Sequence, residues 1–223
     1  MATFLSFDVG GTRIKYALIT DKREIIEKNS THTPDNGQEF WQKIDEIIES
    51  YKSTISGIAF SVPGRVDTEK GIIYIGGALP YLKDIHIKDV FFEKYGLPVA
   101  VVNDAKAAAL AEVWHGSLKG IKDGAVIVLG TGVGGGLILD GKLRNGSHFQ
   151  AGELSFLAQI SQTKVLSVLV VIWARQSEWF LPLIKQLEML MKKMAKKLSL
   201  LSMTIIRRRQ FLKVTVEQLL RLS

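Results

Sequence analysis

Three short segments of the sequence combine residue types that bind phosphate and move protons. The first runs from Asp8 to Lys15 (DVGGTRIK), where glycines let the backbone approach a phosphate group and direct its amides toward it. Thr12 adds a hydroxyl donor, and Asp8, at a strand end, is a candidate to hold Mg²⁺ through water. The same residues also suit an ordinary hairpin turn with a polar rim, so this segment alone leaves both interpretations open.

The second segment is the glycine-rich loop at 130–136 (GTGVGGG). A dinucleotide-binding fingerprint would open a helix and be followed by an acidic residue about 20 positions on. Here an apolar strand and the tight Asp140-Gly141 turn follow instead, which disfavours that interpretation. A flexible turn is the remaining alternative. Two glycine-threonine turns, each between strands, nevertheless favour two clamps that face one polyphosphate.

The third segment is the pair Asn103-Asp104, which ends an apolar strand. A carboxylate at such a strand end faces the ligand crevice of an open sheet. It is placed to take the proton from an attacking hydroxyl, a role that typically contributes about 10²–10⁴ in rate. The alternative is a cap for a helix that starts at Ala105, since aspartate caps helices well. The position of Asp104 does not separate the two.

The elements around these segments alternate between strands and helices, which predicts an α/β architecture. Apolar runs bounded by glycine, proline or asparagine indicate strands, and the spacing of Phe40, Ile44, Ile47 and Ile48 indicates a helix. The predicted strands are 4–7, 14–19, 57–62, 98–102, 125–129, 137–139 and 142–143, and the predicted helices are 39–51 and 105–114.

Five ordered segments between Thr3 and Leu157 resemble the ROK family of sugar kinases and repressors. They are DVGGTRIK, SVPGRVD (61–67) followed by Lys70-Gly71-Ile72, LPVAVVNDAKAAALAE (97–112), VIVLGTGVGGGLILDGKL (126–143), and the stretch from Gly146 through AGELS at Glu153. The resemblance implies an actin-like ATPase (ribonuclease H-like) fold, in which two α/β domains close on ATP and sugar. We expect a first domain over 1–115, the start of a second domain over 116–160, and a second domain that is incomplete.

The resemblance also implies a role for each matching residue. The phosphate and ATP ligands would be Asp8, Gly10, Gly11, Thr12, Lys15, Gly130, Thr131, Gly132 and Gly134, with Asp8 holding Mg²⁺ through water. Asp104 resembles the general base that activates the sugar hydroxyl. Asn103 and Glu153 resemble residues that hold sugar hydroxyls, and Gly64 lies near the same cleft. Phosphoryl transfer needs mainly positioning and charge stabilisation, which such residues and Mg²⁺ supply.

Two departures from the family pattern indicate which branch of the ROK family the chain resembles. Many members carry a histidine three residues after the equivalent of Glu153 and a cysteine cluster for structural zinc. This chain has Phe156 there and no cysteine, so it resembles the zinc-free, β-glucoside kinase-like and glucokinase-like branch, and we expect no zinc. The repressors carry a helix-turn-helix before the first phosphate segment. The residues before Asp8 contain none, so we expect no specific nucleic-acid partner.

The last part of the chain has a different composition. Residues 1–160 carry a net charge of −2, and residues 161–223 carry +9. All 20 glycines lie at or before Gly152, although glycine and aspartate usually form the turns of an α/β protein. The longest strongly apolar run, Val165 to Trp173, falls far short of the roughly 20 residues that span a bilayer. No segment resembles a secretory signal, and we expect a cytoplasmic protein.

We expect residues 161–223 to be an aberrant basic tail. One alternative is that the lysine-rich helical pattern at 180–201 lies on an anionic membrane, or that Arg207 to Arg209 contact phosphate. The hypothesis we favour is a shifted reading frame. Methionine and tryptophan have one codon each, so a shift of two bases forces glycine or aspartate at Trp173-Ala174, Met194-Ala195 and Met203-Thr204. Those two residue types are missing from the tail.

The sequence therefore predicts an ATP-dependent kinase that phosphorylates a hexose or a β-glucoside. ROK proteins often form homodimers, and the sequence leaves the oligomeric state of this chain open. The alternative is a catalytically inactive, truncated ROK protein that binds sugar or phosphate weakly at most.

Overall fold

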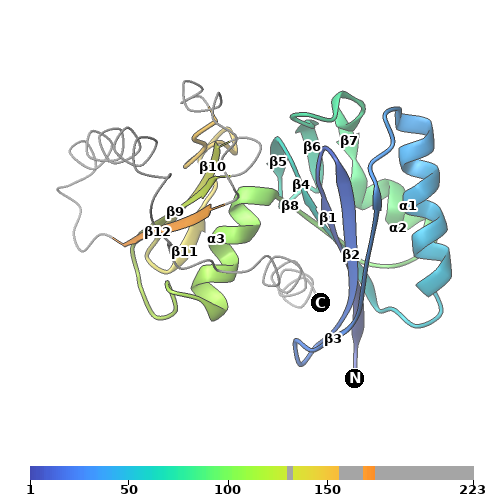
Figure 1. Cartoon of the computed structure of the whole chain (residues 1–223), viewed down its shortest axis with the longest axis horizontal. Coiled ribbons are helices and arrows are strands. Elements are labelled where there is room, and N and C mark those ends of the chain that lie inside the picture. The colour runs from blue at the N-terminus through green and yellow to red at the C-terminus, as the bar shows by residue number, and fades with distance from the viewer. Residues whose placement is uncertain (130–132, 156–167, 174–223) are drawn as a thin grey trace, which may run out of the picture. The chain divides into compact units, whose positions relative to one another are not determined.

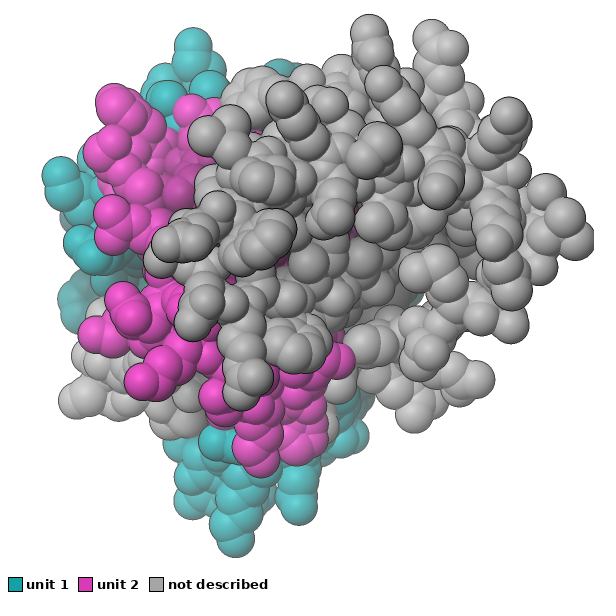
Figure 2. All heavy atoms as spheres, turned by 90° about the vertical axis from the view of Figure 1, so that its left-hand side faces the viewer, with its two compact units in different colours: residues 1–107, 209–223 teal, residues 108–208 magenta. Residues whose placement is uncertain are grey.

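The computed structural model describes residues 1–129, 133–155 and 168–173. The described chain forms two compact units, coloured in Figure 2, whose boundary falls between Ala107 and Ala108. This boundary lies inside helix α3 (Asp104–His115), so one helix belongs to both units.

Unit 1 is built on a five-stranded mixed sheet with the order β3-β2-β1-β4-β8 (Figure 1). Strands β1 (Thr3–Val9), β2 (Arg13–Thr20) and β3 (Ile25–His32) form an antiparallel meander. Strand β4 (Gly57–Val62) lies parallel to β1, and β8 (Val99–Asn103) lies parallel to β4. The carboxyl ends of β1, β4 and β8 therefore meet at one edge of the sheet.

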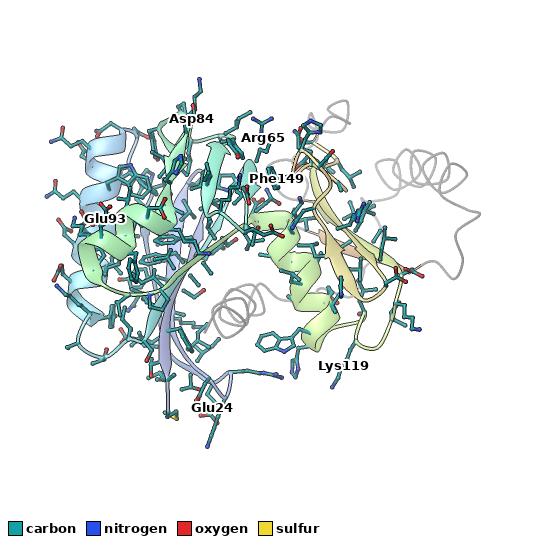
Figure 3. All side chains as sticks on the ribbon, turned by 180° about the vertical axis from the view of Figure 1, so that it is seen from behind. Glu24, Arg65, Asp84, Glu93, Lys119 and Phe149 are labelled. Carbon is teal, nitrogen blue, oxygen red and sulfur yellow. The ribbon has the colours of Figure 1, made fainter. Side chains whose placement is uncertain are left out.

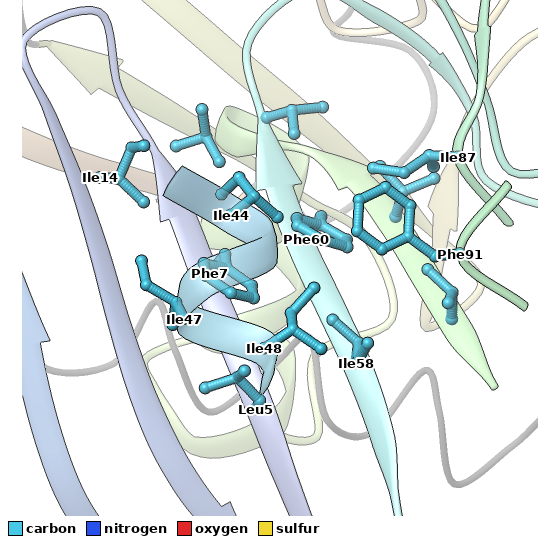
Figure 4. Close-up of a cluster of buried hydrophobic side chains, with 14 of the residues drawn as sticks. Leu5, Phe7, Ile14, Ile44, Ile47, Ile48, Ile58, Phe60, Ile87 and Phe91 are labelled. Carbon is cyan, nitrogen blue, oxygen red and sulfur yellow. The ribbon is translucent and has the colours of Figure 1, made fainter. Parts of the chain in front are cut away.

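The main core of unit 1 lies between this sheet and the helices α1 (Gly37–Tyr51) and α2 (Ile87–Tyr95). Side chains alternate along a strand, so every second residue of β1 and β4 faces the helices. Figure 4 shows the resulting cluster, in which Leu5, Phe7, Ile14, Ile44, Ile47, Ile48, Ile58, Phe60, Ile87 and Phe91 are labelled. Asn36 caps α1 by accepting a hydrogen bond from the N–H of Glu39.

A small three-stranded sheet follows β4 and carries residues next to the sheet edge. Its order is β5-β6-β7, with β5 (Arg65–Asp67), β6 (Ile72–Ile75) and β7 (Ile85–His86) all antiparallel. A short 3₁₀ helix, η1 (Pro80–Leu82), lies between β6 and β7.

Unit 2 contains a four-stranded sheet with the order β11-β10-β9-β12. Strands β9 (Gly124–Leu129), β10 (Val133–Leu139) and β11 (Lys142–Arg144) repeat the antiparallel meander of β1, β2 and β3. The fourth strand breaks the repeat. Strand β12 (Val168–Trp173) lies antiparallel to β9, whereas β4 lies parallel to β1.

The predicted elements are present, with one correction in unit 2. The glycine-rich segment at 130–136 was expected to be a loop, but β10 begins at Val133 and Gly134 pairs with Val128. Strand pairing with β9 extends through the glycines because a ladder uses backbone groups, which glycine also has.

The predictions made for the tail at 180–201 and 207–209 lie outside the described residues. Within the described parts of the chain, no helix is long and apolar enough to cross a membrane.

Candidate functional site

The turn at Gly10–Thr12, between β1 and β2, presents backbone amides. The Gly10 N–H donates to the carbonyl of Arg13 at 3.0 Å, which closes the turn. Two carbonyls are held from the far end of β3, since the Thr33 hydroxyl donates to Gly10 O at 2.6 Å and the Thr33 N–H donates to Thr12 O at 3.1 Å. Within the described chain, the N–H groups of Gly11 and Thr12 donate to no protein group. In the described chain, the turn therefore offers the N–H groups of Gly11 and Thr12 to a ligand, while the carbonyls of Gly10 and Thr12 are held by Thr33.

A charged pair stands beside this turn. Asp8 and Lys15 are register partners across β1 and β2, and Lys15 Nζ lies 2.7 Å from Asp8 Oδ2. The Asp8 side chain is 18% exposed and that of Lys15 is 32% exposed, so both retain access to solvent. The carboxylate of Asp8 and the ammonium group of Lys15 thus lie next to the backbone amides of Gly11 and Thr12.

Gly64 and Asn103 lie together at the same sheet edge. The Asn103 side chain is buried and donates from Nδ2 to the Gly64 carbonyl at 2.8 Å. Gly64 has a φ of 95°, and a Cβ at this position would lie 1.8 Å from the carbonyl oxygen of Ile75. Only glycine fits here, because both the backbone angle and the space exclude a side chain.

Asp104 is the first residue of α3, at the carboxyl end of β8. The cap of this helix is provided by its neighbour, since Asn103 Oδ1 accepts the N–H of Lys106 at 3.1 Å. Asp104 Oδ1 accepts the N–H of Ala105 at 2.8 Å, and the residue is half-buried. The helix thus begins one residue before the Ala105 start considered from the sequence, and a carboxylate in its first turn is favoured by the helix dipole.

These residues meet because their strands are neighbours. Asp8 pairs with Ser61 across β1 and β4, and Val62 pairs with Asn103 across β4 and β8. The predicted phosphate turn, Gly64 and the Asn103-Asp104 pair therefore line one edge of the unit 1 sheet. Ligands of open α/β sheets bind at this kind of edge.

A loop that sequence reasoning missed connects the two ends of the site. A Cβ on Gly64 would lie 2.7 Å from Gly77 N, and a Cβ on Gly11 would lie 3.6 Å from Ala78 Cβ. The segment 76–78 therefore packs against both Gly64 and the phosphate turn. The Gly76-Gly77 dipeptide was the available signal, since paired glycines mark tight turns.

Arg65 is a second residue that sequence reasoning missed. Its guanidinium carbon lies 5.1 Å from the centre of the Tyr74 ring, a cation–π arrangement across β5 and β6. Its Nε is buried and has no hydrogen-bond partner within the described chain. Figure 3 labels this side chain, which directly follows Gly64 in the sequence.

In unit 2, the structure positions Glu153 by close backbone packing. A Cβ on Gly135 would lie 2.5 Å from Gly152 O, so the segment before Glu153 packs directly on β10. Gly152 itself has a φ of 75°. Glu153 Oε1 accepts the N–H of Ser155 at 3.0 Å, and the residue is half-buried. The predicted ligands Gly130, Thr131 and Gly132 lie outside the described residues.

The described residues contain no group of three or more histidine, aspartate or glutamate side chains arranged to hold a metal ion. Mg²⁺ in phosphotransferases is held by one or two carboxylates together with the substrate phosphates. Asp8 with the free amides of Gly11 and Thr12 fits that requirement: a carboxylate suits the hydrated ion, and amides suit phosphate oxygens.

Comparison with known proteins relates this geometry to a family. The chain is 34% identical over 153 residues to the β-glucoside kinase of Listeria monocytogenes, covering 68% of this chain and 52% of that protein. It is 35% identical over 168 residues to the glucokinase of Halalkalibacterium halodurans, covering 71% and 51%. The chain thus spans about half the length of the curated relatives it matches.

A solved structure shares the fold. The ROK family glucokinase of Streptomyces griseus, in complex with glucose and AMPPNP, matches with a TM-score of 0.59 and 28% identity, over 68% of this chain and 49% of that one. The actin-like α/β fold expected from the sequence is confirmed. The ROK family pattern matches residues 4–162, and this chain belongs to the ROK family.

Proposed function

We propose that this chain acts as an ATP-dependent sugar kinase that transfers the γ-phosphate of ATP to a hydroxyl of a hexose or hexoside. The observation that carries the proposal is the edge of the unit 1 sheet, where the free amides of Gly11 and Thr12 share one strand-end row with the Asp104 carboxylate. The names of the relatives, β-glucoside kinase and glucokinase, support a sugar as the acceptor. The AMPPNP in the Streptomyces griseus glucokinase supports ATP as the donor.

The residues divide the work between donor and acceptor. The N–H groups of Gly11 and Thr12 bind phosphate oxygens, and Lys15 adds positive charge where negative charge accumulates. Bound ATP and Mg²⁺ supply the transferable phosphoryl group and neutralise its charge. By their resemblance to the ROK family, Gly130, Thr131, Gly132 and Gly134 are proposed to bind phosphate as well.

On the acceptor side, the carboxylate of Asp104 takes the proton from the sugar hydroxyl as that oxygen bonds to the γ-phosphorus of ATP, while the bond from this phosphorus to the bridging oxygen breaks and ADP leaves. Asn103 is held by Gly64 O and by the N–H of Lys106, so its amide is fixed in orientation before the sugar arrives. Fixed donors lose little entropy on binding, which favours selective recognition of hydroxyl groups. By the same resemblance to the ROK family, Glu153 is proposed to hold a sugar hydroxyl.

The test is phosphoryl transfer by the full chain, assayed with ATP, Mg²⁺ and a panel of hexoses and β-glucosides. Asp104→Asn keeps the size of the side chain and lowers kcat by about 10²–10⁴. Asp89→Asn is the matched control, because Asp89 also lies in the first turn of a helix and its side chain is exposed. Soluble, monodisperse protein without sugar-dependent turnover would contradict the proposal.

The proposal extends to the setting of the protein. A kinase that uses ATP and hexoses works in the cytoplasm, where both are available, and a homodimer is the proposed assembly. Light scattering of the purified chain measures its mass and decides between monomer and dimer.

A second candidate is a ROK protein that binds sugar or phosphate weakly and catalyses nothing. The antiparallel pairing of β12 with β9 favours it, because β4 in the corresponding position of unit 1 lies parallel to β1. Isothermal titration with glucose, cellobiose and ATP, together with the turnover assay, separates the two candidates. The inactive protein would bind these ligands weakly and show no turnover.

A further inference from the structure

Thr33 lies just beyond the carboxyl end of β3, and none of the motifs in the sequence includes it. It is 1% exposed, although the strand before it is mostly exposed and polar. Its hydroxyl donates to Gly10 O at 2.6 Å, and its backbone N–H donates to Thr12 O at 3.1 Å. One residue thus holds two carbonyls of the turn at Gly10–Thr12.

The geometry of the peptide bond converts this contact into control of a donor. In a trans peptide, the carbonyl of Gly10 and the N–H of Gly11 lie in one plane and point in opposite directions. The described chain contains no cis peptide bond. Since the Thr33 hydroxyl holds Gly10 O on its own side, the Gly11 N–H must point to the opposite side.

Thr33 is itself anchored by the residues that follow it. The hydroxyl of Tyr81 donates to Pro34 O at 2.8 Å. A Cβ on Gly37 would lie 2.9 Å from the Cβ of Tyr81, so the start of α1 packs directly on this ring. Because the segment after Thr33 is fixed to η1, the turn cannot carry Thr33 along if Gly10 rotates.

We propose that Thr33 is a positioning residue that aims the N–H of Gly11 at the phosphate of the donor. This inference rests on the proposed function, because it assigns Thr33 to the same phosphate turn. Its side-chain hydroxyl supplies the effect. Valine has the same shape but would leave Gly10 O without its donor, and the peptide plane between Gly10 and Gly11 would be free to rotate.

The experiment uses the full chain labelled with ¹⁵N and titrated with inorganic tripolyphosphate in the presence of Mg²⁺. The variants are Thr33→Val, which removes the hydroxyl, and Thr33→Ser, which keeps it. Thr31→Val is the matched control, since Thr31 lies two residues earlier, on β3, and its side chain makes no hydrogen bond in the described chain. The readouts are the amide resonances of Gly11 and Thr12 and the dissociation constant.

We expect tripolyphosphate to shift the Gly11 and Thr12 amides of the parent chain. Thr33→Val moves the Gly11 resonance of the free protein and raises the dissociation constant about five- to tenfold, the effect of one lost hydrogen bond. Thr33→Ser and Thr31→Val bind within about twofold of the parent chain. Rescue by serine distinguishes an effect of the hydroxyl from a general loss of packing at a buried site.

Three results would overturn the proposal, each in a distinguishable way. If the parent chain binds through Gly11 and Thr12 but Thr33→Val binds equally well, Thr33 has no positioning role and the proposed function stands. If Thr33→Ser loses affinity as valine does, the hydroxyl is not the cause, even where the valine variant is unfolded. If tripolyphosphate does not shift Gly11 in the parent chain, the phosphate role of the turn is wrong, and the role of Thr33 falls with it.

Discussion

Lys15 Nζ lies 2.7 Å from Asp8 Oδ2, and the two residues are register partners across β1 and β2. Strand pairing therefore fixes the position of this ion pair next to the turn at Gly10–Thr12, which connects the two strands. The pair is only partly buried, so solvent screens its attraction, and its position at the strand end bears more on ligands than on folding.

Replacing Lys15 with methionine tests whether the ion pair serves ligand binding more than stability. We expect Lys15→Met to raise the KM for ATP about tenfold, because a cation beside the phosphate turn is lost, while the free energy of unfolding changes by less than about 1 kcal/mol. Steady-state kinetics and urea unfolding measure the two effects. Lys43→Met is the control, since Lys43 pairs with Glu46 on the surface of α1. An unchanged KM together with lower stability would assign Lys15 a structural role only.

Gly64→Ala should destabilise unit 1 by more than about 2 kcal/mol, because a Cβ would meet Ile75 O at 1.8 Å at a φ of 95°. Gly96→Ala is the matched control. Gly96 also has a positive φ, 66°, but a Cβ there meets nothing within 4 Å, so only the backbone cost of about 1 kcal/mol applies. Urea unfolding of both variants separates strain from collision. Equal losses of unfolding free energy in the two variants would mean that the segment 75–77 shifts to accommodate the methyl group at position 64.

Gly11→Ala should leave the fold intact and weaken ATP binding. A Cβ on Gly11 would make an ordinary contact with Ala78 at 3.6 Å, and Gly11 has no positive φ, so we expect stability to change by less than about 1 kcal/mol. In the proposed site, however, the methyl group would stand next to the amide that binds phosphate. Thermal unfolding tests the predicted stability, and ATP titration tests the predicted loss of affinity. An unchanged affinity for ATP would argue against close approach of a phosphate to Gly11.

Alkaline conditions should destabilise the fold through Tyr95. Burial, followed by its hydrogen bond to Asp45, raises the pKa of the Tyr95 hydroxyl well above its ordinary value near 10. The neutral form is thus favoured in the folded state. Its contribution is fully present below pH 10 and is lost as the pH rises toward the folded pKa, because the unfolded chain releases its proton first.

Tyr95→Phe should therefore flatten the fall in unfolding free energy above pH 10, measured by urea unfolding between pH 8 and 11. Tyr74→Phe serves as the comparison, because Tyr74 is only half-buried. A slope unchanged by Tyr95→Phe would show that other groups govern the alkaline transition.

The sequence predicted the strands at 4–7, 57–62 and 98–102 because their apolar runs are continuous and their ends are marked by glycine, proline or asparagine. It also predicted that Gly64, Asn103 and Asp104 belong to one site, through the ROK resemblance. It missed β3, whose residues are mostly exposed and polar, so no alternation marks the strand. Thr33 was missed for the same reason, since its importance comes from contacts with a turn more than 20 residues earlier.

The short strands β5, β6 and β7 were also missed, since two to four residues are too few to show a period. The contacts of segment 76–78 with Gly64 and Gly11 depend on this small sheet and therefore could not be predicted from local pattern.

Segment 76–78 packs against both Gly64 and Gly11, so in the proposed site it acts as a spacer of fixed length between the acceptor end and the donor end. Lengthening or enlarging it would move the two ends apart and misalign the transfer. Under the proposed function, a larger acceptor is therefore disfavoured as long as this segment keeps its length.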